Sequence, residues 1–541
     1  MNKIFAQLIK KRGLDDDFLH PDYEKTADPF LLPDMEKAIA RIKTALKNSE
    51  KILIYGDYDV DGVTASTVME QTLRLISVKP ENINIMLPDR FADGYGMSPK
   101  MVQFAQEQGS KLVITVDCGS RNHAIVDELN TLGVDSIITD HHETDDTLPE
   151  AVAVVNPKRK DFSAPVDSGL EHLAGVGVAF KLAQALVKEG LLPNGQEKWL
   201  LDLVLLGTIC DSMLLSGENR ILTYYGMKVL EKTRRPGLKE LMKKARVKKI
   251  SSEDIGFRLG PRLNAAGRIE TADVSLELLR TNSPVKAAEL ASRLEELNSK
   301  RRTEQLSAIS EIAERGVSDE PVIIEVGDWH EGILGIVAGR LTDDYMRPSF
   351  VLTEVSDQIL KGSGRSFGDF NLAEALNHVK NTIVGGGGHA GAAGVRLKRE
   401  NLYQFREQIN DYYRNLNLKD QTSYLKQKPD LEIEDFADFS LELLERIKTL
   451  EPYGPGNEEI VLHLKHVKIA NITLMGTEKQ HLRLDIEDNA GRPLKIVAFF
   501  ATEKWLELSP ETEISPTIKL VENEFRGVRS VEARLVDLGI E

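Results

Sequence analysis

The sequence predicts an α/β fold: a parallel β-sheet domain, joined by a long helix to a smaller α/β domain and followed by a C-terminal β-barrel. Four short apolar segments rich in β-branched residues lie between residues 51 and 155, and helical segments separate the first three. This alternation is typical of a parallel, doubly wound sheet. Two more strand candidates lie in residues 321–400, and from about residue 459 polar and apolar residues alternate, as in the short strands of a small barrel.

The first domain is expected at residues 46–230, after a polar, helical lead-in at 1–45. Residues 64–75 and 122–132 show helical spacing between its strands, and an apolar helix at 200–215 closes the domain. Its strands are nearly continuous apolar runs, as expected of strands that helices cover on both faces. The predicted strands are 51–55 (KILIY), 111–116 (KLVITV), 136–139 (SIIT) and 151–155 (AVAVV).

A long helix and a second domain follow. Residues 231–320 hold a basic segment and a helical pattern at 285–315, whose polar middle at 298–305 suits a helix that bridges two domains. The second α/β domain is expected at 321–400. Its predicted strands are 322–326 and 349–353, and it ends at the glycine-rich stretch 385–394.

The remainder is expected to be a helical connector at 401–458 and an OB-fold-like β-barrel at 459–541. Residues 487–491 carry a turn signal between two alternating segments. The barrel is either a surface that binds a nucleic-acid strand or a docking site for a partner. Its predicted strands are 481–486, 494–500, 517–521 and 531–536.

The bulk composition bounds the class of protein. The chain has 541 residues, 41% of them hydrophobic and 28% charged, which is ordinary for a soluble protein of about two to four domains. Its two cysteines, Cys118 and Cys210, exclude a disulfide framework, favour a reducing compartment and are interpreted as packing residues. Without a signal-like start or an apolar stretch of membrane-spanning length, we expect a cytoplasmic protein that does not contact a membrane.

The charge is unevenly distributed. A net charge of −16 argues against a nucleic-acid partner, because phosphates repel an acidic surface. However, residues 232–249 carry nine lysines and arginines against one acid, Glu240. The distribution of charge is a better guide than its sum. Two interpretations of this segment stay open, a track for DNA and a solvated helix face.

The first three predicted strands all end in residues that can bind a metal. The carboxyl ends of parallel strands line one crevice, where such folds bind ligands. Alternate residues of an extended segment point the same way, so the three aspartates after the first strand can face one site. In strand order these residues are Asp57, Asp59 and Asp61; Asp117; and Asp140, His141 and His142.

Carboxylates this close together repel each other, and divalent cations remove the repulsion. Carboxylates combined with imidazoles suit manganese, zinc or iron better than calcium. Two ions about 3.5–4 Å apart and bridged by a carboxylate form the arrangement used to hydrolyse phosphate esters. The alternatives are an EF-hand-type calcium loop, whose later ligands Ala65 and Glu70 do not supply, and a helix cap or turn for a lone residue such as Asp117.

These motifs resemble the DHH phosphoesterase superfamily. The segment 56–62 (GDYDVDG) looks like its first motif, Asp117 its second, and 140–142 (DHH) its signature. Asp211, in 207–211 (GTICD), looks like its fourth motif. Further segments resemble the RecJ family of single-strand-specific DNA exonucleases over nearly the whole chain. They are 28–30, 90–96, 260–268 (GPRLNAAGR), 328–340 (DWHEGILGIVAGR), 362–366, 385–389 and 452–454.

The resemblance implies roles for the acidic and imidazole residues. Asp57 takes the place of a histidine ligand in pyrophosphatase relatives, so it either binds metal or only orients the site. His142 is expected to face the scissile phosphate, and Asp140 to support the histidines as a hydrogen-bond acceptor. Asp211 would pass for an ordinary helix residue without the resemblance. The implied metal ligands are Asp59, Asp61, Asp117, His141 and Asp211, and together with His142 they are the expected catalytic residues.

A phosphodiester substrate also needs cations and close backbone approach. Guanidinium groups can grip phosphate in a bidentate manner, and glycine runs bring backbone amides near it, although solvated arginines and flexible turns are the ordinary alternatives. Which of Arg90 and Arg268 reads a terminal phosphate stays open. Tyr95, Phe367 and Trp329 either stack on bases or belong to the core. The candidate substrate-binding residues are Arg90, Tyr95, Arg262, Asn264, Arg268, Arg365, Ser366, Gly387 and His389.

The resemblance implies a 5′-to-3′ exonuclease that hydrolyses single-stranded DNA to nucleoside 5′-monophosphates in DNA repair and recombination. It implies two divalent metal ions, with manganese favoured over magnesium, and a helicase and a single-strand DNA-binding protein as partner classes. The rival functions are a nanoRNase or cyclic-dinucleotide phosphodiesterase of the same superfamily, a small-substrate pyrophosphatase, and a non-catalytic single-strand DNA-binding scaffold. The extra barrel counts against the first two, and the complete set of ligand positions against the third.

Overall fold

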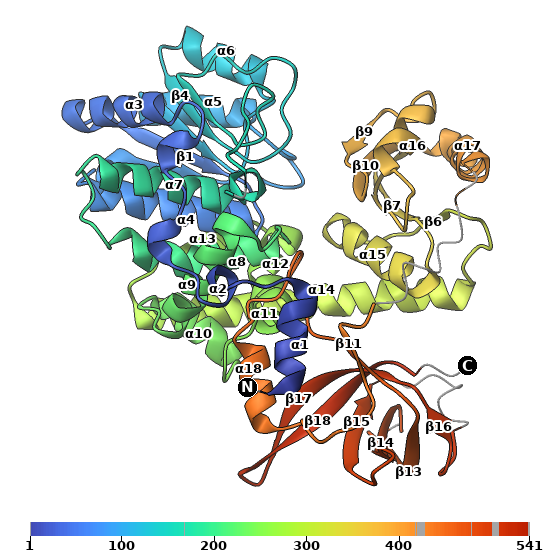
Figure 1. Ribbon diagram of the computed structural model, residues 1–541. Coiled ribbons are helices and arrows are strands. Elements are labelled where there is room, and N and C mark those ends of the chain that lie inside the picture. The colour runs from blue at the N-terminus through green and yellow to red at the C-terminus, as the bar shows by residue number, and fades with distance from the viewer. Residues whose placement is uncertain are drawn as a thin grey trace. The chain divides into compact units, whose positions relative to one another are not determined.

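Three β-sheets organise the chain in the computed structural model (Figure 1). The structure describes residues 2–166, 168–416, 418, 428–477, 479–499 and 508–538. They divide into two units. The large unit is Ala27–Met213 with Gly226–Leu425, and the small unit is Met1–Thr26 with Leu214–Tyr225 and Lys426–Glu541.

The first sheet of the large unit is entirely parallel, with strand order β2-β1-β3-β4-β5. The four predicted strands are present, which confirms the parallel sheet. The strand that was not predicted, β2, is four residues long at the edge, and only its first residue is fully buried, so it lacks the apolar run of its neighbours. The strands are β1 Ile52–Gly56, β2 Ile83–Met86, β3 Leu112–Val116, β4 Asp135–Thr139 and β5 Ala153–Val155.

Helices cover both faces of this sheet. On one face, apolar side chains of α5 (Pro99–Gln108) and α6 (His123–Thr131) share a core cluster with β1, β3 and β4. On the other, α4 (Val60–Leu75) packs against α7 (Gly175–Lys188) and α8 (Leu201–Cys210). Thirteen of the residues of α4 are buried, among them polar ones, so this helix runs through the interior. Its N-terminus therefore starts at the carboxyl edge of the sheet.

Helix α14 (Pro284–Arg315) links the two sheets of the large unit. Its first half buries Ala291 and Leu294 beside the preceding helices, and its second half buries Ala308 and Ile312 against the second sheet's layer. The predicted bridging helix is thus present. The other helices before it are α3 Met35–Asn48, α9 Gly217–Glu231, α10 Pro236–Lys244, α11 Ser252–Asp254, a π-helical turn Ile255–Leu259, α12 Gly260–Ile269 and α13 Asp273–Arg280.

The second sheet has the order β6-β7-β8-β10-β9 and is mixed, with only β6 and β7 parallel. The glycine run was predicted to bring backbone amides near phosphate, with a flexible turn as the alternative. In the structure Gly385–Gly388 is not a turn but forms β9, an edge strand paired with β10. Backbone pairing needs no side chains, so poly-glycine can complete a sheet. The elements are β6 Ile323–Val326, α15 Leu334–Tyr345, β7 Ser349–Ser356, β8 Ile359–Arg365, α16 Leu372–His378, β9, β10 Ala392–Lys398 and α17 Leu402–Asn415.

The small unit is built on one eight-stranded sheet of order β11-β12-β17-β18-β15-β14-β13-β16. Apolar residues of α1 and α18, including Phe5 and Leu443, join its core. Among the described residues, no helix combines the length and apolar character needed to cross a bilayer. The elements are α1 Lys3–Arg12, α2 Asp16–Leu19, β11 Leu431–Ile433, α18 Leu441–Lys448, β12 Leu462–Leu464, β13 Val467–Met475, β14 His481–Glu487, β15 Pro493–Ala498, β16 Glu513–Ile514, β17 Thr517–Phe525 and β18 Val528–Asp537.

This division differs from the sequence expectation in two places. The start of the expected lead-in, up to Thr26, belongs to the small unit. The expected helical connector at 401–458 contains helices α17 and α18 but also strand β11, which pairs in parallel with β12 of the eight-stranded sheet. Residues 417 and 419–427 of that connector, and 478, 500–507 and 539–541 of the expected barrel, lie outside the described residues.

Candidate metal centre and phosphate-binding site

The carboxyl edge of the first sheet gathers the predicted acidic and imidazole residues. Strands β1, β3 and β4 are neighbours, so the residues that follow them share this edge. Asp59 also caps α4, because its Oδ1 accepts the N–H of Gly62 at 3.1 Å. Asp211 reaches the same place from the C-terminal end of α8.

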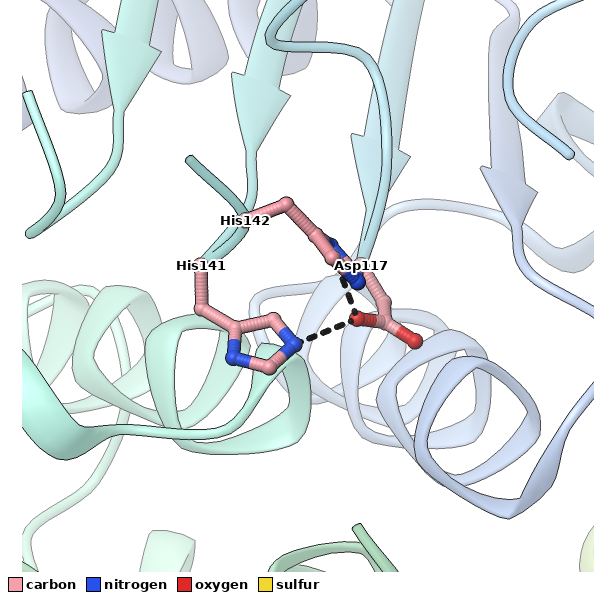
Figure 2. A group of neighbouring side chains, drawn as sticks. All are labelled: Asp117, His141 and His142. Atoms are coloured by element: carbon pink, nitrogen blue, oxygen red, sulfur yellow. Dashed lines mark ion pairs between the residues drawn. The ribbon is translucent and has the colours of Figure 1, made fainter. Parts of the chain in front are cut away.

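Three overlapping groups of side chains present ligand atoms within 4.8 Å of one another. His141 Nε2 lies 3.1 Å from Asp117 Oδ1, 3.7 Å from Asp61 Oδ2 and 3.6 Å from Asp211 Oδ2. Figure 2 shows both imidazoles beside the Asp117 carboxylate. Because Asp117 and His141 each belong to two groups, the cluster is continuous. The groups are Asp117, His141 and His142; Asp61, His141 and Asp211; and Asp57, Asp59 and Asp117.

The electrostatics of the cluster favour bound cations. Burial and repulsion by neighbouring carboxylates raise the pKa of Asp57 and Asp117, that of Asp61 to about 7 and that of Asp211 to about 8. One oxygen each of Asp57 and Asp117 is buried without a hydrogen-bond donor. A buried carboxylate oxygen without a partner is costly, and a divalent ion supplies the missing positive charge. Carboxylates with an imidazole therefore fit ions such as Mn²⁺.

These pKa shifts predict how stability responds to pH. Four carboxylates have raised pKa values, so from about pH 4 to about pH 8 the metal-free folded state binds more protons than the unfolded state, and stability falls as pH rises. Burial lowers the pKa of His141 to about 4, so this residue alone makes stability rise with pH. Its effect ends at the ordinary histidine pKa, above which the unfolded histidine is neutral as well. A bound metal ion takes the place of the protons on these carboxylates, so it stabilises the folded state more as pH rises.

We therefore expect the melting temperature with excess Mn²⁺ minus that with EDTA to grow from pH 5 to pH 8. Subtracting the two conditions on the same protein cancels titrations elsewhere in the chain. A difference that shrinks as pH rises would contradict a carboxylate-based metal centre.

The two histidines are held in different protonation states. Asp140 Oδ1 lies 2.9 Å from His142 Nδ1 and also accepts the backbone N–H groups of His141 and His142, while its Oδ2 accepts that of Ser120. Although burial disfavours the charged form, the hydrogen bond to Asp140 raises the pKa of His142 to about 9. Burial lowers the pKa of His141 to about 4. His141 is thus a neutral ligand candidate, and His142 a half-exposed cation.

Asp61 is fixed by the start of α7. Its carboxylate accepts the N–H of Gly175 at 2.6 Å and that of Val176 at 2.9 Å. Backbone N–H groups at a helix N-terminus favour a negative charge. The carboxylate of Asp61 is therefore oriented before any ion arrives.

Close packing by glycines surrounds these ligands. Asp117 itself has a positive φ of 64°, which an aspartate adopts at a cost. A Cβ on Gly175 would lie 2.5 Å from the Cβ of Asp117, and one on Gly207 would lie 2.6 Å from Oδ1 of Asp61. A Cβ on Gly62 would lie 2.4 Å from the carbonyl oxygen of Asp57. The ligand cluster thus depends on residues without side chains at three contacts.

Arginines form a second cluster on the same unit. Burial and the positive charges of Arg90, Arg301 and Arg365 lower the pKa of Arg268 to about 9, which still leaves it charged at neutral pH. Burial and Arg90 likewise lower the pKa of Arg365. The negative charge of Asp59 opposes the shift at Arg268. An anion such as phosphate would relieve this repulsion.

The loop before α5 places two of the predicted residues. The Arg90 guanidinium lies 4.9 Å from the ring centre of Tyr58. Tyr95 is 52% exposed, and its hydroxyl lies 2.8 Å from His142 Nδ1. This loop therefore connects the arginine cluster to the metal-ligand cluster.

Other predicted substrate residues are engaged in contacts within the protein. Arg262 pairs with Glu295, with Nε 2.6 Å from Oε2, so its guanidinium is already engaged by a carboxylate. Asn264 accepts the N–H of Val60 at 3.2 Å and so holds the segment after Asp59. Ser366 donates to the carbonyl oxygen of Phe370.

The three aromatic candidates for base stacking differ in how exposed they are. Trp329 is buried, 8% exposed, and its Nε1 donates to Glu311, so it belongs to the core. Phe367 is half-buried. Tyr95 is the exposed one of the three.

Gly387 and His389 lie at the edge of the second sheet. Gly387 is an exposed residue of β9, and His389 is exposed, with Nδ1 accepting the N–H of Gly391 at 3.2 Å. No group of metal-ligand candidates among the described residues includes His389.

In the basic segment 232–249, two arginines make contacts within the protein, whereas the lysines are exposed. Arg235 pairs with the buried Asp202 at 3.1 Å, and Arg234 stacks on Trp199 with 3.6 Å to the ring centre. The lysines of this segment are exposed. Its role in binding DNA stays a prediction.

Sequence reasoning missed Arg301, Gly175 and Gly207 as contributors to this site. Arg301 lies in the polar middle of α14, and its Nε is buried without a hydrogen-bond partner. The polar stretch in the middle of this helix could have pointed to Arg301 as a candidate site residue. The contact of Gly175 with Asp117 could not be read from sequence spacing, because the two residues are far apart in the chain.

Three family descriptions match this chain in order. Residues 51–208 match the DHH family, N-terminal domain; residues 319–415 match the DHHA1 domain; and residues 430–537 match the RecJ OB domain. Together with the three sheets, these matches confirm the predicted fold class, a parallel-sheet DHH domain with a smaller α/β domain and an OB-fold domain.

Known relatives extend the match over nearly the whole chain. It is 35% identical to the single-stranded-DNA-specific exonuclease RecJ of Bacillus subtilis over 99% of this chain and 68% of the relative. It is 34% identical to the protein of that name from Escherichia coli, over 93% of this chain and 89% of the relative. The crystal structure of Thermus thermophilus RecJ in complex with Mn²⁺ superposes with a TM-score of 0.81 and 26% identity, covering 99% of this chain and 76% of that one. This chain therefore belongs to the RecJ family.

Proposed function

We propose that this chain is a divalent-metal-dependent exonuclease that hydrolyses single-stranded DNA. The observation that carries the proposal is the continuous cluster of carboxylates and imidazoles at the carboxyl edge of the first sheet, in a chain whose relatives are named single-stranded-DNA-specific exonucleases. The similar Thermus thermophilus chain was crystallised with Mn²⁺ and with Mg²⁺.

Two ions, with manganese favoured and magnesium also suitable, match the shape of the cluster. The group containing Asp57 and Asp59 and the group containing Asp211 meet through Asp117 and His141. The chain would hold the ions through Asp57, Asp59, Asp61, Asp117, His141 and Asp211. Bound there, they would activate water and stabilise charge on the reacting phosphate.

The protein's own groups would position the strand. His142 is charged at neutral pH and half-exposed, so it can donate to a phosphate oxygen. Tyr95, hydrogen-bonded to His142, would limit where that imidazole turns. Arg90, Arg268 and Arg365 would bind the terminal phosphate of the strand.

An end-binding arginine cluster beside the ligand cluster supports removal of one nucleotide at a time from a 5′ end. The products would be nucleoside 5′-monophosphates, in the setting of DNA repair and recombination. A helicase and a single-strand DNA-binding protein are the partner classes that would supply and present such strands. We propose a role in strand binding for the OB-fold domain.

The decisive assay compares substrates. We expect Mn²⁺-dependent release of labelled mononucleotide from a 5′-labelled single strand, and slow release of label from a 3′-labelled one. Preferential cleavage of dinucleotides, cyclic dinucleotides or pyrophosphate would instead support the rival phosphoesterase functions. Binding of single strands without any hydrolysis would support a scaffold.

Removing the Arg268 guanidinium is expected to weaken binding of the strand end. In Arg268→Ala, KM for a 5′-phosphorylated strand should rise about 10- to 100-fold, because a charge-assisted contact to phosphate is lost. Arg293→Ala is the matched control, since Arg293 is exposed and pairs with Glu296 at 3.1 Å. An Arg268→Ala enzyme with an unchanged KM would remove Arg268 from the proposed binding site.

A further inference from the structure

An aromatic contact joins the Arg90 loop to the second α/β domain. The rings of Phe91 and His330 meet edge to face, with centres 5.2 Å apart and planes at 88°. Phe91 directly follows Arg90, and His330 precedes the 3₁₀ turn Glu331–Ile333. The two rings therefore connect a phosphate-binding candidate to a turn far along the chain.

The other side of His330 shapes that turn. Its Nδ1 accepts the N–H of Gly332 at 3.1 Å, which makes His330 the cap of the turn. Because Nδ1 accepts this hydrogen bond, a neutral His330 carries its ring proton on Nε2. Glu331 pairs with Lys361 of β8 at 2.6 Å, so the turn is also attached to the second sheet.

The same turn holds Arg268. The carbonyl oxygen of Gly332 lies 3.3 Å from Nη1 of Arg268. A Cβ on Gly332 would lie 1.8 Å from the carbonyl oxygen of Arg268, so only glycine permits this approach. His330 thus contacts the Arg90 loop with its ring and, through Gly332, supports Arg268.

The two arginines need such support because they repel each other. The charge of Arg90 is one of the causes that lower the pKa of Arg268. Arg90 is carried by a loop with an ordered turn: the Asp89 carboxylate accepts the N–H groups of Phe91 and Ala92 at 2.8 and 3.1 Å. That turn orders the loop internally but does not fix it against α12.

We propose that Phe91 and His330 are positioning residues that hold Arg90 and Arg268 at the spacing required by the 5′-terminal phosphate of a single strand. This inference rests on the proposed exonuclease function. Neither Phe91 nor His330 belongs to the metal-ligand groups found among the described residues. Their loss should therefore affect binding of the strand end more than the chemical step.

The test separates the two contacts of His330. Asparagine in His330→Asn can still accept the N–H of Gly332, as asparagine does at helix caps, but it removes the ring. Phe91→Ala removes the partner ring alone. Each variant should raise KM for a 5′-phosphorylated strand about three- to tenfold, with kcat within twofold of the parent, because an edge-to-face pair stabilises by a modest amount.

Three further readouts distinguish positioning from general damage. The preference in kcat/KM for 5′-phosphorylated over 5′-hydroxyl strands should shrink in both variants. The double variant should have a KM no higher than that of the more impaired single variant, because the two rings act as a pair. Phe91→Tyr, which keeps the ring, should restore KM and the preference. Melting temperatures close to that of the parent verify folding, and Phe91→Leu replaces Phe91→Ala if the latter melts early.

The inference is overturned if the parent digests single strands while both variants keep the parent KM and 5′-phosphate preference, or if the two effects add fully. If the parent itself digests no single strands under any divalent ion, the proposed function fails first. The two failures are therefore distinguishable.

Discussion

Replacing Asp117 by asparagine is expected to lower kcat on single-stranded DNA by about a thousandfold or more, since removal of one member of a catalytic group disables the whole group. Asp117 belongs to two of the three ligand groups, and its Oδ1 lies 3.1 Å from His141 Nε2. Asparagine is isosteric and tolerates the positive φ of this position, so the backbone is expected to survive. The loss would then reflect the missing negative charge.

The measurement is single-turnover digestion of a 5′-labelled strand, together with a Mn²⁺ titration followed by melting temperature. Asp135→Asn is the control: Asp135 starts β4, and pairs with Arg41 at 2.5 Å. It makes the same chemical change at the far end of a strand whose carboxyl end carries the DHH motif. An Asp117→Asn protein that keeps parental activity and Mn²⁺ stabilisation would contradict the ligand assignment.

Replacing Gly175 by alanine is expected to damage both activity and stability without touching a ligand's chemistry. The new Cβ would lie 2.5 Å from the Cβ and 2.6 Å from Oδ1 of Asp117. The N–H of Gly175 also holds Asp61 at 2.6 Å, so any shift of α7 moves a second carboxylate. We expect a loss of about 1–3 kcal/mol of stability from overpacking. Activity should fall about a hundredfold or more, because misplacement by about 1 Å suffices for that.

Gly256→Ala is the matched control. A Cβ there would meet nothing within 4 Å, so alanine should be neutral or slightly stabilising. Urea unfolding gives the free energy of unfolding of each variant, and strand digestion gives its activity. A Gly175→Ala protein that is as stable and active as the parent would show that α7 can retreat from Asp117 without cost.

The parallel sheet and its acidic edge could be predicted because both depend on short patterns of consecutive residues. Each of the runs 51–55, 111–116 and 136–139 is apolar and β-branched, and the residue that can bind metal follows at once. Parallel strands bring such positions together whatever lies between them. Asp211 was different: a single acid at the end of an apolar helix carries no local signal, and only the family resemblance pointed to it.

What could not be predicted depends on distant neighbours. Arg262 carries the same chemistry as Arg268, but an acid 33 positions away, Glu295, engages it. Strand β9 shows no alternation, because four glycines present no side chains to alternate. Gly175 matters only through the ligand that it lets approach.

The domain to which the start of the chain belongs also could not be predicted from the sequence. Helix α1 is amphipathic and polar enough to read as a lead-in to the next domain. Its apolar residues Ile4, Phe5 and Leu8 belong to the core of the C-terminal sheet. Sequence order therefore misassigned the partner of this helix, although the helix itself was expected.

The central claim is that the carboxylates gathered at the sheet edge bind divalent ions. Anomalous diffraction at a manganese-sensitive wavelength, from crystals of this protein grown with Mn²⁺, tests it directly. We expect two peaks, one held by Asp57, Asp59 and Asp117 and one held by Asp61, His141 and Asp211. Ordered carboxylates with no anomalous peak between them, at a Mn²⁺ concentration that supports digestion of single strands, would contradict it.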